Sequence, residues 1–233
     1  MFKRSPNVEY IDFSFLDEGV LDSLFPISTT FFRNSITVVD TTHNTLRSTL
    51  VDSVRNEFEI YQKLGYLKDV GVTGLPDNKG KGSSRFSIHN NNLAVELDRI
   101  VNRTFAQEKE YQSVSDYFRF MKYTKGGQHY PHYDTDFIYG DGYKTTHSLV
   151  MFFTNNESGN LYFCNEPIGS TNKTQDWNRH ASHEEIYLSI KPKVGRIVIF
   201  PHTLAHGVSE CEEDLRIAVR GDLIYYEGLK KPL

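Results

Sequence analysis

The sequence predicts an α+β, mainly β domain: a β-sandwich or jelly roll with N-terminal helices packed on one sheet. Three observations support this prediction. Short runs rich in aromatic and β-branched residues follow one another from about residue 117, helical periodicity is confined to two earlier segments, and Tyr (14) and Phe (16) are abundant. The length of 233 residues suits one domain with a sizeable core. We therefore expect a single domain over 1–233, with a helical support region over about 1–110 and a jelly-roll core over about 84–226.

Two segments have the periodicity of amphipathic helices. In 45–64 hydrophobic residues recur every three or four positions, and Gly65 follows as the expected stop. In 92–104 a second hydrophobic face is expected, with Asn91 or Asn92 as the helix cap. The hydrophobic positions of the two helices are Leu46, Leu50, Val54, Phe58, Tyr61 and Leu64, then Leu93, Leu97, Ile100 and Val101.

The segment 68–84, between these helices, is rich in glycine and lysine and contains a proline. Such a composition predicts a mobile loop. We consider two roles for it, a lid that covers the substrate of an enzyme and a surface insertion without function.

Strand-like runs dominate the rest of the chain. Each is rich in aromatic and β-branched residues, and Gly, Asn, Asp or Pro separates it from the next. The expected strands are 118–123, 147–153, 160–164, 185–190, 195–200 and 216–226.

Composition limits the partners and the compartment. The net charge of -4 and the pI near 6.1 predict no general affinity for nucleic acid. Cys164 and Cys211 are too few for a disulfide framework or a zinc cluster, so both are expected to be reduced thiols. There is no secretory signal at the N-terminus and no long apolar run, so we expect no membrane contact and a cytoplasmic protein. The sequence gives no indication of the oligomeric state.

A candidate metal site begins at His132-Tyr133-Asp134. Residues two apart in a strand share a face, so an imidazole and a carboxylate would lie side by side. These are two of the three ligands of a 2-His-1-carboxylate iron site, although such a triplet alone is also compatible with a surface ion pair. A third ligand is available at His202 or His206, and periodicity does not choose between these two because they have the same strand parity.

Two arginines follow in the last predicted strand. Arg216, Ala218 and Arg220 would share one face, and Ile217 and Val219 the other. If the first face lines the interior, the guanidiniums need an anionic partner there, and their fork suits a carboxylate. If it lies outside, the arginines are simply solvated.

Taken together, these motifs resemble those of the prolyl 4-hydroxylase-like 2-oxoglutarate oxygenases. The similar features are the run Tyr123 to Asp134 with its Gly-Gly-Gln, the segment 195–200, His206-Gly207-Val208, and Arg216 ten residues after the histidine. The ending at 216–222 is similar to a subgroup that closes with Leu-Arg-Thr-Asp, and 84–87 is similar to the arginine-containing strand before the family's long helix. The resemblance covers about residues 84–226 and implies a double-stranded β-helix that uses iron(II), 2-oxoglutarate and O₂.

The resemblance also implies roles for individual residues. His132, Asp134 and His206 match the iron ligands, which leaves His202 a supporting or structural role. Arg216 matches the basic residue that binds the distal carboxylate of 2-oxoglutarate, and Tyr123 the tyrosine that helps to hold it. Substrate contacts are expected from Arg85 and Arg220.

The expected activity is hydroxylation of a peptidyl residue, prolyl by resemblance, with release of succinate and CO₂. The alternatives are hydroxylation of a free amino acid or another small metabolite, and a binding module without turnover. Two departures weaken the analogy with collagen hydroxylases: the segment 158–163 lacks the family's Gly-Gly-x-Thr, and position 216 is Arg instead of Lys. The retained carboxylate of Asp134 disfavours a halogenase, because related halogenases lack that carboxylate.

Overall fold

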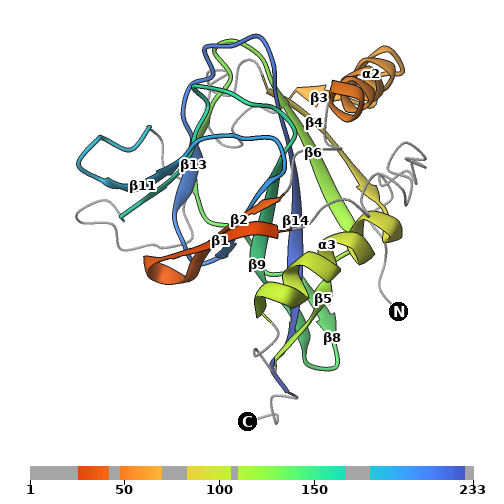
Figure 1. Cartoon of the computed structure of the whole chain (residues 1–233), viewed down its shortest axis with the longest axis vertical. Helices are drawn as coiled ribbons and strands as arrows, with labels where there is room; N and C mark the ends of the chain where they lie inside the picture. Colours follow the sequence, from red (N-terminus) through yellow and green to blue (C-terminus); the bar gives the residue numbers. More distant parts are fainter. Residues whose placement is uncertain (1–25, 42–47, 70–82, 106–109, 166–178, 229–233) are drawn as a thin grey trace.

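The computed structural model describes residues 26–41, 48–69, 83–105, 110–165 and 179–228. The chain is mostly β, with two antiparallel sheets and few helices, an arrangement consistent with a jelly roll (Figure 1). In chain order the elements are β1 (Pro26–Phe32), the 3₁₀ turn η2 (Arg33–Ser35), β2 (Ile36–Thr41), α2 (Ser48–Lys63), β3 (Lys68–Asp69), β4 (Ser83–His89), α3 (Asn91–Phe105), β5 (Tyr111–Val114), β6 (Tyr117–Tyr123), β7 (His129–His132), β8 (Ile138–Gly140), β9 (Tyr143–Phe152), β10 (Leu161–Cys164), β11 (Ile186–Ile190), β12 (Arg196–Pro201), β13 (His206–Val208) and β14 (Arg216–Tyr226).

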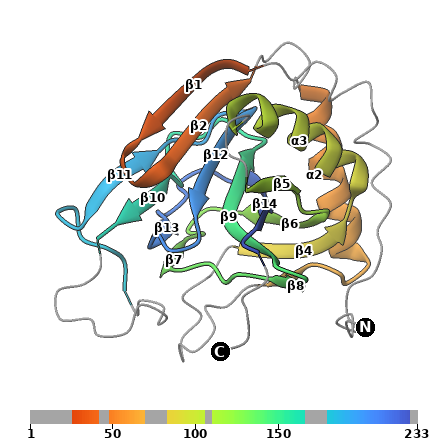
Figure 2. The ribbon, with the colours of Figure 1, turned by 90° about the horizontal axis from the view of Figure 1, so that it is seen from below.

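The larger sheet has ten strands, with the order β1-β2-β12-β9-β14-β6-β4-β3, while β5 pairs with β14 and β8 with β9. The smaller sheet has four strands in the order β11-β10-β13-β7. Figure 2 shows the smaller sheet beside one side of the larger sheet and helices α2 and α3 on the other. Because side chains alternate along a strand, each central strand of the larger sheet contributes to two different cores.

The first core lies between the larger sheet and the two helices. Phe58 of α2 and Leu97 of α3 are fully buried in it, together with Ile217 and Val219 of β14. The second core lies between the two sheets and includes Ala218, from the opposite face of β14. The alternation predicted for 216–220 is therefore confirmed.

The two helices lie close to the predicted segments, with differences at their ends. Gly65, two residues after the end of α2, has a φ of 78°, which confirms it as the stop. Leu64 does not join the hydrophobic face, since the helix ends at Lys63 and Leu64 is 62% exposed. The cap of α3 is Asn90, not Asn91 or Asn92, because its Oδ1 accepts the hydrogen bond from the backbone N of Leu93 at 2.9 Å. The other predicted apolar positions of the first helix, Leu46, Leu50 and Val54, have side chains outside the described residues.

The expected helical support region over about 1–110 is not supported as stated. Residues 26–41 form the hairpin β1–β2, whose β-branched residues favour strands, and β2 joins the larger sheet beside β12. The ion pair of Arg196 with Asp40, at 2.7 Å, joins the two strands. Strands β3 and β4 come from the same part of the chain, so this region contributes strands as well as helices.

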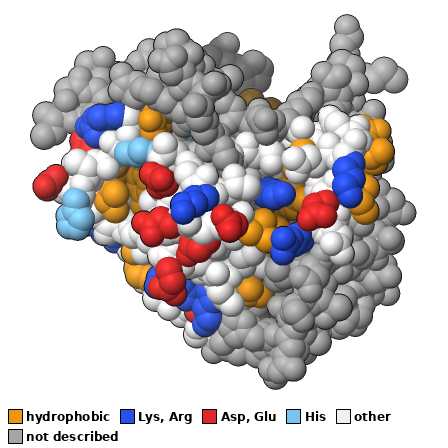
Figure 3. All heavy atoms as spheres, turned by 90° about the horizontal axis from the view of Figure 1, so that it is seen from above, with side chains coloured by type: hydrophobic (Ala, Val, Ile, Leu, Met, Phe, Trp, Pro, Cys, Tyr) orange, Lys and Arg blue, Asp and Glu red, His pale blue; other side chains and the backbone are white. Residues whose placement is uncertain are grey.

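The glycine-rich segment 68–84 begins and ends in paired strands, since Lys68 pairs with Arg85 and Asp69 with Ser84. Its central residues, 70–82, lie outside the described residues. The prediction of a lid concerns these residues and stays a prediction. None of the helices in the described part of the chain is long and apolar enough to cross a membrane. On the face shown in Figure 3, acidic and basic side chains are mixed, with hydrophobic side chains between them.

Candidate active site

Two histidines and an aspartate converge between the sheets. His132 ends β7, His206 begins the neighbouring strand β13, and the two residues are paired in register. Asp134 follows β7 by two residues, just beyond the end of the strand. One ligand atom from each of the three lies within 4.8 Å of the others, a group able to hold a metal ion. The tertiary structure therefore brings together the three predicted iron ligands.

Hydrogen bonds to the backbone fix the orientation of both imidazoles. The Nδ1 atom of His132 lies 2.9 Å from the carbonyl oxygen of Tyr130, and that of His206 lies 3.0 Å from the carbonyl oxygen of Leu204. A carbonyl only accepts, so each Nδ1 carries the proton and each Nε2 presents a lone pair. Burial, and next the neighbouring His206, lowers the pKa of His132 to about 4, which keeps it in the neutral form that binds metals.

The carboxylate of Asp134 is held at both oxygens. Ser148 Oγ donates to Oδ2, and Arg220 Nη2 lies 3.2 Å from Oδ1. Burial alone would raise the pKa of Asp134, but Arg220 and the imidazoles of His206 and His132 bring it well below its usual range. Asp134 is thus a charged carboxylate, as a hard cation requires.

His202 takes a different place from His206. Its ring is 2% exposed, its Nδ1 lies 3.0 Å from Asp136 Oδ1, and its Nε2 lies 3.2 Å from Asp222 Oδ1. Asp222 also accepts from Arg220 Nη2 at 2.8 Å. His202 therefore contacts Asp222, which in turn binds Arg220, the partner of Asp134. Of the two histidines, His206 is the member of the metal-binding cluster.

The guanidinium of Arg216 is buried, and Tyr123 is the side chain that compensates part of its charge. Arg216 is 1% exposed, and its Nε and Nη1 have no hydrogen-bond partner among the described residues. Its Cζ lies 4.6 Å from the ring centroid of Tyr123 and 5.2 Å from that of Phe152. An unpaired buried guanidinium is costly, so this arrangement fits an anionic ligand with a carboxylate.

A close glycine makes room for this arginine. At Gly159, whose φ is 68°, a Cβ would lie 2.8 Å from Arg216 Cδ. Residues 158–163 depart from the family's Gly-Gly-x-Thr. Gly159 is nevertheless needed here, because a side chain at this position would collide with Arg216.

His129 is a residue at the site that sequence reasoning missed. Its ring centroid lies 4.2 Å from that of His132, and its Nδ1 lies 3.1 Å from the carbonyl oxygen of Tyr130. Burial, and next the neighbouring imidazole of His132, lowers the pKa of His129 to about 3. Residues three apart in a regular strand point to opposite faces, so the spacing of His129 and His132 gave no signal; a register shift in the pairing of β7 with β13 separates the two positions. Ser148, inside a predicted strand, gave no signal either.

The two predicted substrate residues are placed differently. Arg220 is buried and committed to Asp134, Ser148 and Asp222, so it is not presented as a free group for substrate. Arg85 is exposed on β4, and its register partner Met121 lies in β6 next to the site.

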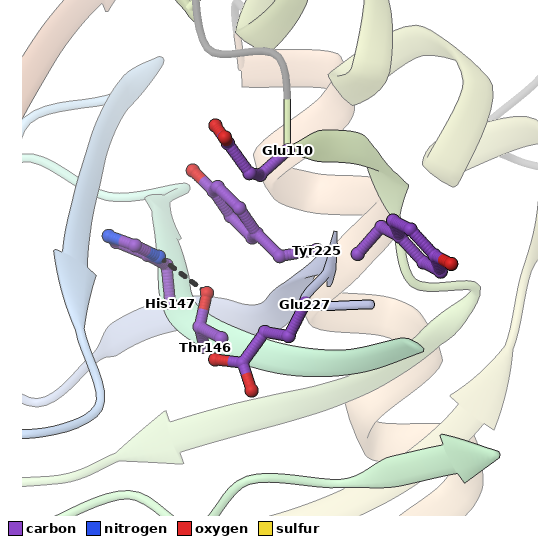
Figure 4. A pocket seen from close by; sticks show the side chains of 6 residues that line it. Glu110, Thr146, His147, Tyr225 and Glu227 are labelled. Atoms are coloured by element: carbon purple, nitrogen blue, oxygen red, sulfur yellow. Dashed lines mark hydrogen bonds between the residues drawn. The ribbon is translucent and has the colours of Figure 1, made fainter. Parts of the chain in front are cut away.

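A separate surface pocket of about 610 Å³ lies away from the cluster (Figure 4). Thr146 Oγ and His147 Nδ1 are hydrogen-bonded at 2.8 Å on its wall. None of the cluster residues lines it. The lining residues are Glu110, Thr146, His147, Tyr225, Tyr226 and Glu227.

Comparison with known proteins agrees with this geometry. Residues 118–221 match the family model described as the 2OG-Fe(II) oxygenase superfamily. The chain is similar in fold to a prolyl hydroxylase from Trichoplax adhaerens, solved with a peptide fragment of the hypoxia inducible factor oxygen degradation domain (TM-score 0.54, 15% identity, 84% of each chain covered). It is also similar to a prolyl-4-hydroxylase from Pseudomonas putida (TM-score 0.53, 16% identity, 82% of this chain and 93% of that chain).

A third similar structure is the non-heme alpha ketoglutarate dependent carbocyclase SnoK from nogalamycin biosynthesis (TM-score 0.54, 11% identity, 92% of this chain and 88% of that chain). At such identities these likenesses establish the fold. Comparison with curated proteins finds no match.

The superfamily requires Fe(II), 2-oxoglutarate and O₂, and the cluster of His132, Asp134 and His206 fits an iron site. Residues 118–221 therefore form a 2OG-Fe(II) oxygenase domain, and the chain resembles prolyl hydroxylases in its fold.

Proposed function

We propose that this chain is an iron(II)- and 2-oxoglutarate-dependent hydroxylase of a peptidyl residue, prolyl in the leading hypothesis. In this proposal His132, Asp134 and His206 bind the iron, and Arg216 with Tyr123 binds the distal carboxylate of 2-oxoglutarate. The observation that carries it is the fully buried guanidinium of Arg216, whose Nε and Nη1 lack partners among the described residues. Iron, 2-oxoglutarate and O₂, when bound, supply the oxidation that converts a substrate C–H to C–OH with formation of succinate and CO₂.

The residues of the chain position and shield these groups. Three protein ligands leave coordination positions open for the cosubstrate and for oxygen. Arg216 offers two unsatisfied donors in a fork, the geometry that a carboxylate accepts. Burial raises the pKa of Tyr123, against the opposing charge of Arg216, so its hydroxyl stays protonated and able to donate a hydrogen bond.

Aromatic rings close the site on the side of the second core. The ring of Phe200 lies 4.6 Å from that of His206, edge to face, and Phe163 packs against Phe200 at 5.0 Å. Both phenylalanines are fully buried. They keep water away from this side of the cluster, which strengthens the electrostatic interactions inside it.

The choice of a peptidyl substrate rests on the motif resemblance and on the similarity in fold to two prolyl hydroxylases. A free amino acid or another small metabolite is the competing substrate class, and SnoK shows that the fold alone does not separate them. A single oxygenase domain over 1–233 and a cytoplasmic location stay predictions.

The test is succinate formation by the iron(II)-loaded chain with a panel of prolyl peptides, other peptides and free amino acids. Hydroxylated prolyl peptide in proportion to succinate supports the proposal. Coupled turnover with free amino acids alone would refute the peptidyl substrate, and a chain that binds iron but never turns over 2-oxoglutarate would refute the enzyme. His206→Ala serves as the inactive control.

A further inference from the structure

Besides Arg216, three arginines lie on the same face of the larger sheet beside the cluster. Arg220 of β14 pairs in register with Arg119 of β6, and Arg119 also pairs with Ser87 of β4. Arg85 is two residues from Ser87, so it lies on the same face, diagonally next to Arg119.

The opposite face of the same strands is hydrophobic. Phe86 and Phe120 stack at 5.0 Å in the core under the helices. Their neighbours in sequence, Arg85 and Arg119, therefore point to the side that carries Arg216 and Arg220.

The positive charges are compensated unequally. Arg220 has Asp134 and Asp222 as partners, at 3.2 and 2.8 Å. Among the residues that the structure describes, no carboxylate pairs with Arg85 or Arg119. Like charges on neighbouring positions of a sheet repel each other. This arrangement therefore favours binding of an anion that does not belong to the described residues.

The pair also lies within electrostatic reach of the site. The charge of Arg85 opposes the rise in the pKa of Tyr123. Burial, and next the charge of Arg119, lowers the pKa of Arg85 itself. The smaller sheet ends at β7, and in the larger sheet Arg119 and Arg85 lie on β6 and β4, next to its β3 edge. Arg85 is exposed and Arg119 half-buried, which leaves both within reach of a ligand.

We infer that Arg85 and Arg119 form an anion-binding subsite next to the cluster, and that the substrate carries a carboxylate or phosphate group beside the position that is oxidised. The inference rests on the proposed function, since it assigns a chemical class to the substrate of that site. An arginine pair suits either anion because each guanidinium offers a planar fork of donors.

The experiment measures binding of three fluorescent prolyl peptides that differ only in the residue next to the proline: Glu, phosphoserine or Gln. The protein is the full chain loaded with manganese(II) and 2-oxoglutarate, and the readout is fluorescence anisotropy. Arg85→Gln and Arg119→Gln are compared with wild type and with Arg55→Gln. Arg55 is an exposed residue of α2, which packs on the other face of the sheet, so its replacement matches the change in charge away from the site.

We expect wild type and Arg55→Gln to bind a peptide with an anionic group roughly tenfold more tightly than the Gln peptide, and Arg85→Gln and Arg119→Gln to lose most of this preference. The tighter of the Glu and phosphoserine peptides identifies the anion. Equal or unmeasurable binding of all three peptides to wild type overturns the inference, as does an unchanged preference in both variants. Binding that depends on the anionic group, but is not followed by hydroxylation with iron(II), would refute the proposed prolyl activity and leave the subsite standing.

Discussion

Arg216 and Tyr123 face each other across β14 and β6 as register partners, with the guanidinium carbon 4.6 Å from the centre of the phenol ring. The ring covers one face of the guanidinium, a cation–π contact that compensates part of the burial cost. The Nε and Nη1 donors, which have no partner among the described residues, remain available to a carboxylate. The pair explains how a buried charge is tolerated before the cosubstrate binds.

Removal of a cluster residue is expected to abolish turnover of 2-oxoglutarate. His132→Ala, Asp134→Ala and His206→Ala each remove one of three ligands, whereas His202→Ala leaves all of them in place. Iron content and succinate formation are the measurements. If His202→Ala loses iron while His206→Ala keeps it, the assignment of the third ligand is wrong.

Replacement of Arg216 is expected to weaken 2-oxoglutarate binding far more than iron binding. Loss of a confined charge-assisted pair costs on the order of several kcal/mol, about a hundredfold or more in affinity. Arg216→Lys should lose less, because the charge remains while the fork is lost. Calorimetric titration of the manganese-loaded variants checks this, and equal affinity in wild type and Arg216→Ala would refute it.

Tyr123→Phe tests the hydroxyl separately from the ring. The ring over Arg216 is retained, so the fold should be preserved, while loss of one hydrogen bond should reduce 2-oxoglutarate affinity by roughly tenfold. Tyr123→Leu removes the ring as well and should reduce affinity further. Identical affinities for Tyr123→Phe and wild type would show that the hydroxyl does not touch the cosubstrate.

Gly159→Ala should disturb the site through Arg216. The added Cβ would lie 2.8 Å from Arg216 Cδ, so the guanidinium must shift. Gly126→Ala is the matched control, because Gly126 also has a positive φ, 80°, but nothing within 4 Å of its Cβ position. Both variants should lose about 1 kcal/mol of stability from backbone strain. Only Gly159→Ala should also weaken 2-oxoglutarate binding, and equal affinities for the two variants would contradict this.

Arg220→Gln tests whether the ion pair with Arg220 positions the carboxylate of Asp134. Without the guanidinium at 3.2 Å, the carboxylate loses a charged partner and is held by Ser148 and the ligand geometry alone. We expect faster dissociation of iron, measured with a chelator, while 2-oxoglutarate affinity at saturating iron changes little. Arg220→Lys should recover part of the loss. An unchanged rate of iron release would show that Arg220 is not needed to position Asp134.

The sequence by itself predicted six of the strands from 117 onward, both helices to within a few residues, and the adjacent cluster residues His132 and Asp134, but not the short strands β7, β8 and β13. These features follow from local periodicity and from a motif in which His132 and Asp134 are near neighbours. It did not predict the hairpin β1–β2, because the pattern of 26–41 is short and its pairing partner β12 is more than 150 residues away. It also misplaced the cap of α3.

Periodicity left His202 and His206 open, the family resemblance favoured His206, and the tertiary structure brings His206 into the cluster. The two have the same strand parity, but β12 ends at Pro201 and β13 begins at His206, so one imidazole is directed to Asp222 and the other to the cluster. Only the tertiary structure decided the shared face of Arg85, Arg119 and Arg220, which depends on the register of three strands. Contacts between segments distant in sequence depend on long-range packing, which single-sequence periodicity does not encode.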